Sequence, residues 1–116
     1  MVGALPRDLR AADVTYVVRF VQEYAPADRD AFLELEARFA EMERRRDDWP
    51  SGVRMQPYAG SEPTHALVWE SSFATLAEAL EAIGRIESDA EHEALFREQA
   101  PLITRARTEI YEVLEP

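Results

Sequence analysis

The chain has 116 residues and a formal net charge of −10, because 23 acidic residues outnumber 13 basic ones. It contains no cysteine, which excludes disulfides, thiolate catalysis and cysteine-bound metal clusters. All 13 basic residues are arginine, so chemistry through a lysine Schiff base is excluded as well. The acidic balance argues against nucleic-acid or anionic-membrane binding, because each phosphate contact needs a nearby cation.

The length indicates one domain with one core. Residues 1–13 show no sustained periodicity and are predicted to form a flexible leader, so that a single domain covers residues 14–116. No apolar run approaches the roughly 20 residues that cross a bilayer, and the first seven residues lack the apolar stretch of a secretory signal. We therefore expect a cytoplasmic protein with no membrane partner.

The first half of the chain predicts a strand and a helix. Apolar alternation indicates a strand over residues 14–23, with one wholly apolar face and one mixed face. Pro26 breaks this strand, and a helix is expected from Asp28 to the arginines at 44–46. Its apolar stripe is Phe32, Leu35, Phe39 and Met42. The opposite side of the helix offers two ion pairs at i,i+4, namely Glu34–Arg38 and Glu41–Arg45.

Two further strands follow a turn at residues 49–52. The first is predicted over residues 53–59 and contains Pro57, which cannot donate to a strand ladder. This strand is therefore expected at a sheet edge. The next strand is predicted over residues 65–73 and carries Leu67, Trp69 and Phe73 on one parity.

The second half of the chain predicts two helical pieces and a last strand. Thr75 begins a capping box with Glu78, and Ser88 begins a second one with Glu91. The apolar stripe of the first piece is Leu76, Ala79, Leu80 and Ile83. The last strand is predicted over residues 107–114.

The order strand–helix–strand–strand–helix–strand predicts an α+β, ferredoxin-like βαββαβ sandwich, a four-stranded antiparallel sheet with helices on one face. Its usual strand order, 4-1-3-2, places the second strand at an edge, in agreement with Pro57. The other face of the sheet is half apolar, through Val17, Val21, Ala66 and Val68. We expect a second copy of the chain to cover this face, which gives a homodimeric α/β barrel.

Several segments of the sequence resemble a known superfamily. They are Ser88-Asp89-Ala90-Glu91-His92-Glu93-Ala94-Leu95-Phe96, Pro101-Leu102-Ile103, Thr108-Glu109-Ile110-Tyr111-Glu112-Val113-Leu114 and Leu67-Val68-Trp69-Glu70-Ser71-Ser72-Phe73-Ala74-Thr75-Leu76. Over residues 14–114 the chain resembles the dimeric α/β-barrel proteins, and among them NIPSNAP-type and antibiotic-biosynthesis-monooxygenase-like small bacterial proteins. The resemblance implies a ferredoxin-like homodimer with a small-molecule pocket in each subunit and no cofactor.

Members of this superfamily include cofactor-free antibiotic-biosynthesis monooxygenases, haem-degrading monooxygenases and isomerases. The monooxygenases characteristically use an asparagine beside a tryptophan. This chain contains no asparagine, which counts against those two oxygenase activities.

The strongest candidate for a polar site is the pair Arg19 and Glu70, predicted on the mixed faces of adjacent central strands. One interpretation is a structural ion pair at the dimer interface. The other is a catalytic pair, in which Arg19 holds a carboxylate or enolate and Glu70 acts as a base. His65, at the start of the third strand, is a further candidate for moving a proton, or else an ordinary surface histidine.

Four residues are candidates for lining a ligand cavity: Tyr58, Trp69, Tyr111 and Gln56. The alternative for Trp69 is packing against the helices, and for Tyr58 packing across the dimer interface. No metal is expected, because the two histidines lack the spacing of a ligand set. The sequence and the resemblance thus predict that the protein binds a small, partly apolar molecule, aromatic or lipid-like, in the barrel between two subunits, with cofactor-independent oxygenase- or isomerase-like activity. The alternative is a non-catalytic structural or interaction module whose second sheet face is only a dimer interface.

Overall fold

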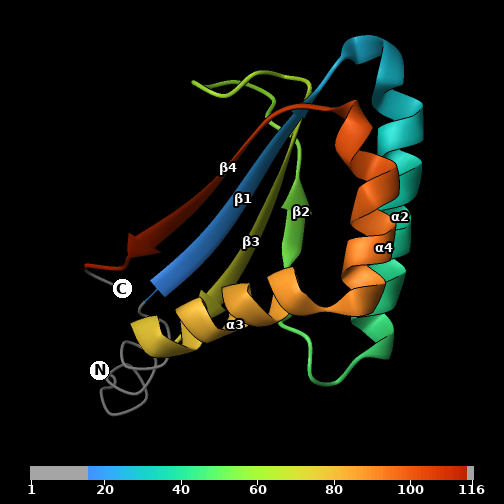
Figure 1. Ribbon diagram of the computed structural model, residues 1–116. Coiled ribbons are helices and arrows are strands. Elements are labelled where there is room, and N and C mark those ends of the chain that lie inside the picture. The colour runs from blue at the N-terminus through green and yellow to red at the C-terminus, as the bar shows by residue number, and fades with distance from the viewer. Residues whose placement is uncertain (1–15, 115–116) are drawn as a thin grey trace.

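The computed structural model describes residues 16–114 as a four-stranded antiparallel sheet with helices on one side (Figure 1). The elements are β1 (Tyr16–Tyr24), α2 (Arg29–Arg45), β2 (Val53–Met55), β3 (Ala66–Phe73), α3 (Leu76–Ser88), α4 (Ala90–Gln99) and β4 (Ile103–Glu112). Short 3-10 turns, Pro26–Asp28 and Ala100–Leu102, precede α2 and β4. The strand order β2-β3-β1-β4 confirms the predicted ferredoxin-like fold and its edge strand. The predicted leader, residues 1–13, lies outside the described residues, as do residues 14 and 15 of the first predicted strand.

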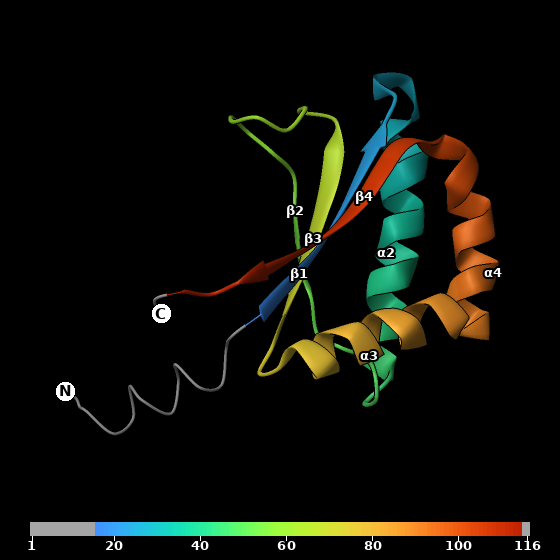
Figure 2. The same ribbon diagram turned by 60° about the vertical axis from the view of Figure 1, so that its left-hand side comes forward.

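The helices form a layer on one face of the sheet. Helices α2 and α4 lie side by side, and α3 crosses one end of the sheet (Figures 1 and 2). Helix α4 packs against both α2 and α3, whereas α3 contacts β1 and β3. No helix within residues 16–114 has the length and apolar character needed to cross a membrane.

The strand register separates two sets of side chains, because residues directly opposite each other in a ladder point to the same side. Phe20 pairs with Trp69, and both face the helices. Arg19 pairs with Glu70 and with Glu109 on the other side of the sheet, which we call the open face. The open face comprises Val17, Arg19, Val21, Glu23, Val53, Met55, Ala66, Val68, Glu70, Ser72, Arg105, Arg107, Glu109 and Tyr111.

The main core lies between the sheet and the helices. Its buried members are Val18, Phe39, Met42, Trp49, Trp69, Ala79, Ile86 and Leu95. The rings of Phe20 and Trp69 stack with centroids 5.1 Å apart. Gly52 lies directly against this indole, because a Cβ atom at that position would stand 2.0 Å from the Trp69 Nε1. The close contact explains why the turn before β2 contains a glycine.

Two predicted strand boundaries were wrong. Strand β2 ends at Met55 and not at residue 59, because Pro57 lacks the N–H that would extend the ladder. Strand β4 begins at Ile103, four residues before the predicted start, because Ile103 pairs with Tyr24 at the far end of β1.

The predicted stripe of α3 was partly wrong. Leu76 and Leu80 are exposed, while Ala79, Ala82 and Ile86 are buried. Helix α3 crosses the end of the sheet (Figure 1). Its alanines are buried there, and its two leucines are exposed to solvent. The first capping box is confirmed at its threonine, whose hydroxyl accepts a hydrogen bond from the Glu78 N–H at 3.1 Å.

The second cap and the ion pairs of α2 also differ from expectation. Asp89 caps α4 in place of Ser88, and its carboxylate accepts from the His92 N–H at 2.9 Å. Arg38 pairs with Glu98, and Arg45 pairs with Glu91. These arginines therefore bridge α2 to α4 and do not form the predicted i,i+4 pairs, because α4 lies alongside α2 and brings its carboxylates within reach.

Candidate functional site

Three of the predicted site residues meet on the open face. The Arg19 Nε donates to the Glu70 Oε2 at 2.7 Å, and the guanidinium carbon lies 4.9 Å from the centre of the Tyr111 ring. Burial opposes the charge on Arg19, but the hydrogen bond and charge of Glu70 outweigh it and raise the pKa of the guanidinium. The hydroxyl of Tyr111 donates to Glu109, which raises the tyrosine pKa.

The other predicted site residues lie elsewhere. His65 is half-buried at the opposite end of β3 from Phe73, edge-on to Tyr24 with ring centroids 6.0 Å apart. Tyr58 is 98% exposed in the loop between β2 and β3. The Gln56 side chain accepts a hydrogen bond from Arg29 at 3.3 Å. Within a single subunit, these three residues therefore do not join the Arg19–Glu70 pair.

Trp69 lies on the opposite side of the sheet, where a cleft separates the sheet from the helices. This helix-side cleft has a volume of about 600 Å³. Strands β1 and β4 supply one wall through Phe20, Gln22, Ala106 and Thr108. Ala106 and Thr108 are exposed although they share the face that carries the helices. The cleft is therefore open along β4, which no helix covers.

An aromatic cluster lines the helical side of the cleft, with His92 at its centre. The imidazole lies 5.0 Å from the Phe39 ring, 5.8 Å from Trp49 and 6.2 Å from Phe96, measured between centroids. The imidazole is half-buried in this cluster, although acidic residues flank it in the sequence. Burial lowers the pKa of His92 below its ordinary value, although Asp89 and two glutamates oppose this effect. The imidazole is therefore neutral at neutral pH.

A buried charge network also lines the cleft. Arg54 on β2 donates from Nε to Glu36 at 2.7 Å and through both terminal nitrogens to Glu43, at 3.0 and 2.7 Å. The Gln99 amide donates to the second oxygen of Glu36, also at 2.7 Å. Burial disfavours the charged guanidinium, but Glu43 and Glu36 outweigh this effect and raise the pKa of Arg54. One guanidinium thus holds two carboxylates.

The spacing of two glutamates in the sequence is a signal for this network. Glu36 and Glu43 are seven residues apart, and each follows a stripe residue, Phe32 or Phe39, by four positions. This spacing places both acids on the apolar side of α2. A buried carboxylate needs a cation, and Arg54 has the correct parity on β2 because it pairs with Trp69.

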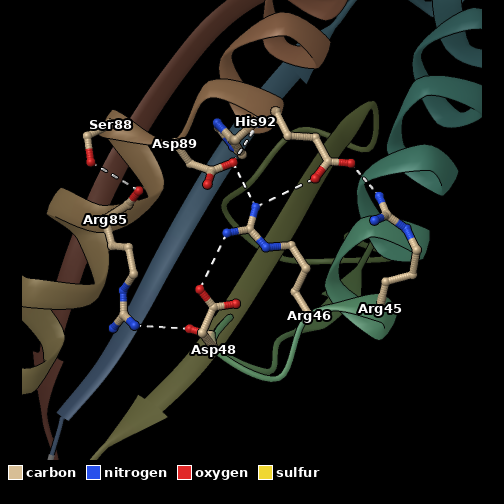
Figure 3. A network of polar contacts seen from close by, with 8 residues as sticks. Arg45, Arg46, Asp48, Arg85, Ser88, Asp89 and His92 are labelled. Carbon is tan, nitrogen blue, oxygen red and sulfur yellow. Dashed lines mark hydrogen bonds and ion pairs between the residues drawn. The ribbon is translucent and has the colours of Figure 1, made fainter.

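A second network of polar contacts lies beside the aromatic cluster and joins α2 to α4 (Figure 3). Arg46 donates to Asp89 at 2.8 Å and to Asp48 at 3.4 Å, and its guanidinium lies 4.8 Å from the centre of the Trp49 ring. The bond from Arg46 lowers the pKa of Asp89, the residue that caps α4. Arg85 donates to the Asp48 carbonyl at 3.0 Å. These contacts tie the end of α2 to the start of α4 and so hold Trp49 beside His92.

Comparison with known proteins identifies the fold. A scan against protein-family models found no match, and a search of curated proteins found none either. Among solved structures, a NIPSNAP family protein from Agrobacterium tumefaciens superposes with a TM-score of 0.71, at 13% identity over 89% of each chain. The fold is that of the NIPSNAP structures.

Two other solved structures share the same fold. A candidate antibiotic biosynthesis monooxygenase from Nitrosomonas europaea has a TM-score of 0.62 and 16% identity, covering 86% of this chain and 99% of its own. A dimeric ferredoxin-like protein from an uncultured marine organism has a TM-score of 0.66 and 7% identity, covering 91% and 93%. The predicted resemblance is thus confirmed at the level of fold, which is what such identities establish.

Proposed function

We propose that the protein binds a small, partly apolar organic molecule in the helix-side cleft. The observation that carries this proposal is the cleft itself, whose volume of about 600 Å³ falls within the range typical of small-molecule sites. Its walls combine aromatic rings with a few fixed polar groups, a combination that favours and orients a planar apolar ligand. The fold shared with a candidate antibiotic biosynthesis monooxygenase agrees with this function.

His92 is the group we propose for proton transfer to or from the ligand. Cofactor-independent oxygenases and isomerases both need a base that removes a proton from the bound molecule. His92 lines the cleft and is neutral at neutral pH, so its free ring nitrogen can accept that proton. The earlier candidates Arg19, Glu70 and His65 remain a second proposal, because a partner subunit could complete a site on the open face.

The experiment that tests ligand binding uses the tryptophans. Both tryptophans of the chain, Trp49 and Trp69, line the cleft, so a bound aromatic molecule changes their fluorescence. Ala106→Phe places a ring in the open side of the cleft and is expected to abolish binding. Arg105→Phe places the same ring on the other face of the same strand and should leave binding intact.

The result that overturns this proposal is specific. If naphthylmethanol and its charged analogues, naphthylmethylammonium and naphthoate, all change neither the fluorescence nor the melting temperature of the wild-type protein, the cleft is not a binding site. Equal binding by the Ala106→Phe and Arg105→Phe variants would place the ligand outside the cleft.

We also propose that the open face pairs with a second copy of the chain. Val53 and Met55 on the edge strand are 62% and 40% exposed, and Tyr111 is 46% exposed. These apolar side chains alternate with the paired charges of Arg19 and Glu70, so a second copy can cover this pair without leaving either of its charges unpaired. The dimeric ferredoxin-like protein of the same fold supports this assembly. The alternative to ligand binding is a non-catalytic protein whose only function is this pairing between two copies.

A further inference from the structure

The charge of the helix-side cleft is strongly unbalanced. Its lining residues include Glu36, Glu43, Glu87 and Glu93. Two arginines are also among them, Arg54 and Arg107, and Arg54 already holds Glu36 and Glu43. The network of these three residues therefore carries one excess formal negative charge, and Glu36 within it is 7% exposed.

The arginines nearest the cleft do not relieve this charge. Arg107 contributes to the wall, but it pairs with Val21 in the sheet register and its guanidinium binds Glu62 and Glu109 on the open face. Arg97 binds Glu93 at 3.2 Å and compensates that one carboxylate. His92 adds no positive charge, because burial keeps its imidazole neutral at neutral pH.

The aromatic cluster strengthens the same preference. The faces of aromatic rings attract cations, and the attraction is largest where water is excluded. Trp49 already binds the Arg46 guanidinium on one face, at 4.8 Å from the ring centre. A cation in the cleft would therefore be attracted by the faces of the aromatic rings and by the carboxylate oxygens. An anion would be repelled by both groups.

We propose that the ligand of the cleft is a cationic aromatic molecule: a planar apolar body beside Trp49, His92 and Phe96 with an ammonium or amidinium group near Glu36 and Glu43. This inference rests on the proposed function of the cleft and specifies its substrate class. It separates amines from the fatty acids and aromatic acids that an apolar cavity alone would also accept. The Arg54 guanidinium is a poor anion site, because three of its five N–H donors already bind two carboxylates whose combined charge exceeds its own.

The test compares three probes that differ only in charge: naphthylmethylammonium, naphthylmethanol and naphthoate. Calorimetric titration of the wild-type protein at neutral pH should give the tightest binding for the ammonium and the weakest for the carboxylate. One uncompensated charge in a partly buried site corresponds to a difference of about tenfold or more in Kd. Added salt should reduce this difference.

Two variants locate the charge responsible. Glu43→Gln leaves Arg54 paired with Glu36 and makes the network neutral, so the ratio of the ammonium Kd to the naphthoate Kd should rise by about tenfold. Glu81→Gln removes an equal charge from an exposed position on α3 and should leave the ratio unchanged. Circular dichroism checks that each variant is folded. The three titrations of the wild-type protein test the inference even if a variant does not fold.

The outcomes separate the two proposals. If naphthoate binds as tightly as the ammonium probe, or more tightly, the inference about charge is wrong while the cleft remains a binding site. If Glu81→Gln changes the ratio as much as Glu43→Gln, the preference arises from the net charge of the chain and not from the cleft, and the inference is again overturned. If none of the three probes binds, the proposed function fails, and this inference fails with it.

Discussion

Both faces of the sheet carry an ion pair between arginine and glutamate, but the two ion pairs differ in burial. On the open face, Arg19 holds one carboxylate, and the side chains of Arg19 and Glu70 are 32% and 26% exposed. On the helix side, Arg54 holds two carboxylates, and the side chain of Glu36 is only 9% exposed. A balanced, half-hydrated pair can be covered by another protein surface at little cost. On the open face Arg107 also holds more than one carboxylate, since it pairs with Glu23, Glu62 and Glu109, but these acidic side chains are 18–29% exposed. A buried network with an excess carboxylate leaves charge for a ligand to neutralise, so burial, and not stoichiometry, distinguishes the two faces.

Removing the arginine from each face should expose this difference most strongly. Arg54→Met leaves Glu36 and Glu43 close together without a cation, and we expect it to lower the free energy of unfolding by about 3 kcal/mol. In the separate subunit, Arg19→Met leaves Glu70 in contact with water and should cost about 1 kcal/mol or less. Urea unfolding measures both losses at one protein concentration, low enough to keep the chain monomeric, because the stability of a dimer depends on concentration. Equal losses for the two variants would contradict the comparison.

The helix side should also be the more sensitive to added volume. Gly52→Ala directs a methyl group into the Trp69 indole, and we expect a loss of about 2–3 kcal/mol. Gly84→Ala is the matched control, because no atom lies within 4 Å of a Cβ there and the position is inside α3. It should stabilise the protein by about 0.5–1 kcal/mol. Thermal unfolding measures the stability of the two variants. A Gly52→Ala variant as stable as the wild-type protein would show that the indole of Trp69 is not held tightly.

A charge added to the open face should weaken the association of two subunits and leave the stability of each subunit unchanged. Val53→Asp adds a charge to the exposed edge of this face, and we expect it to raise the Kd of the dimer by about tenfold, or about 1.4 kcal/mol. Leu80→Asp adds the same charge to an equally exposed leucine on α3 and should leave the Kd unchanged. Sedimentation equilibrium measures both values. A wild-type chain that is monomeric at micromolar concentration would disprove the assembly.

The smallest expected effect is the pH dependence contributed by His92. Because burial holds its pKa in the folded protein below the ordinary 6.5, the unfolded chain binds the proton more readily. The free energy of unfolding should therefore fall as the pH is lowered below about 6.5, and this contribution should level off below the folded-state pKa. His92→Gln should remove it, whereas His65→Gln should retain it. If the two variants lose stability with pH in parallel, His92 is not the group responsible.

The fold was predictable from local patterns, and the cleft was not. Alternating apolar residues and Pro57 were enough for the sheet and its edge, because strand period and proline chemistry are properties of short segments. The helix-side cleft depends on where α4 lies relative to α2 and β4, which no single segment specifies. His92 illustrates this, since its aromatic neighbours come from α2, the turn before β2 and α4. Arg19 and Glu70 were correctly placed together because both lie on adjacent strands.

The most direct test of the central claim is a proton–nitrogen NMR titration of the wild-type protein with naphthylmethylammonium. If the helix-side cleft is the binding site, the indole N–H signals of Trp49 and Trp69 and the amide of His92 shift with the probe. The amides of Val17 and Tyr111 on the open face then stay unchanged. Shifts confined to those open-face signals, with both indoles unaffected, would contradict the account and place the ligand between two sheets.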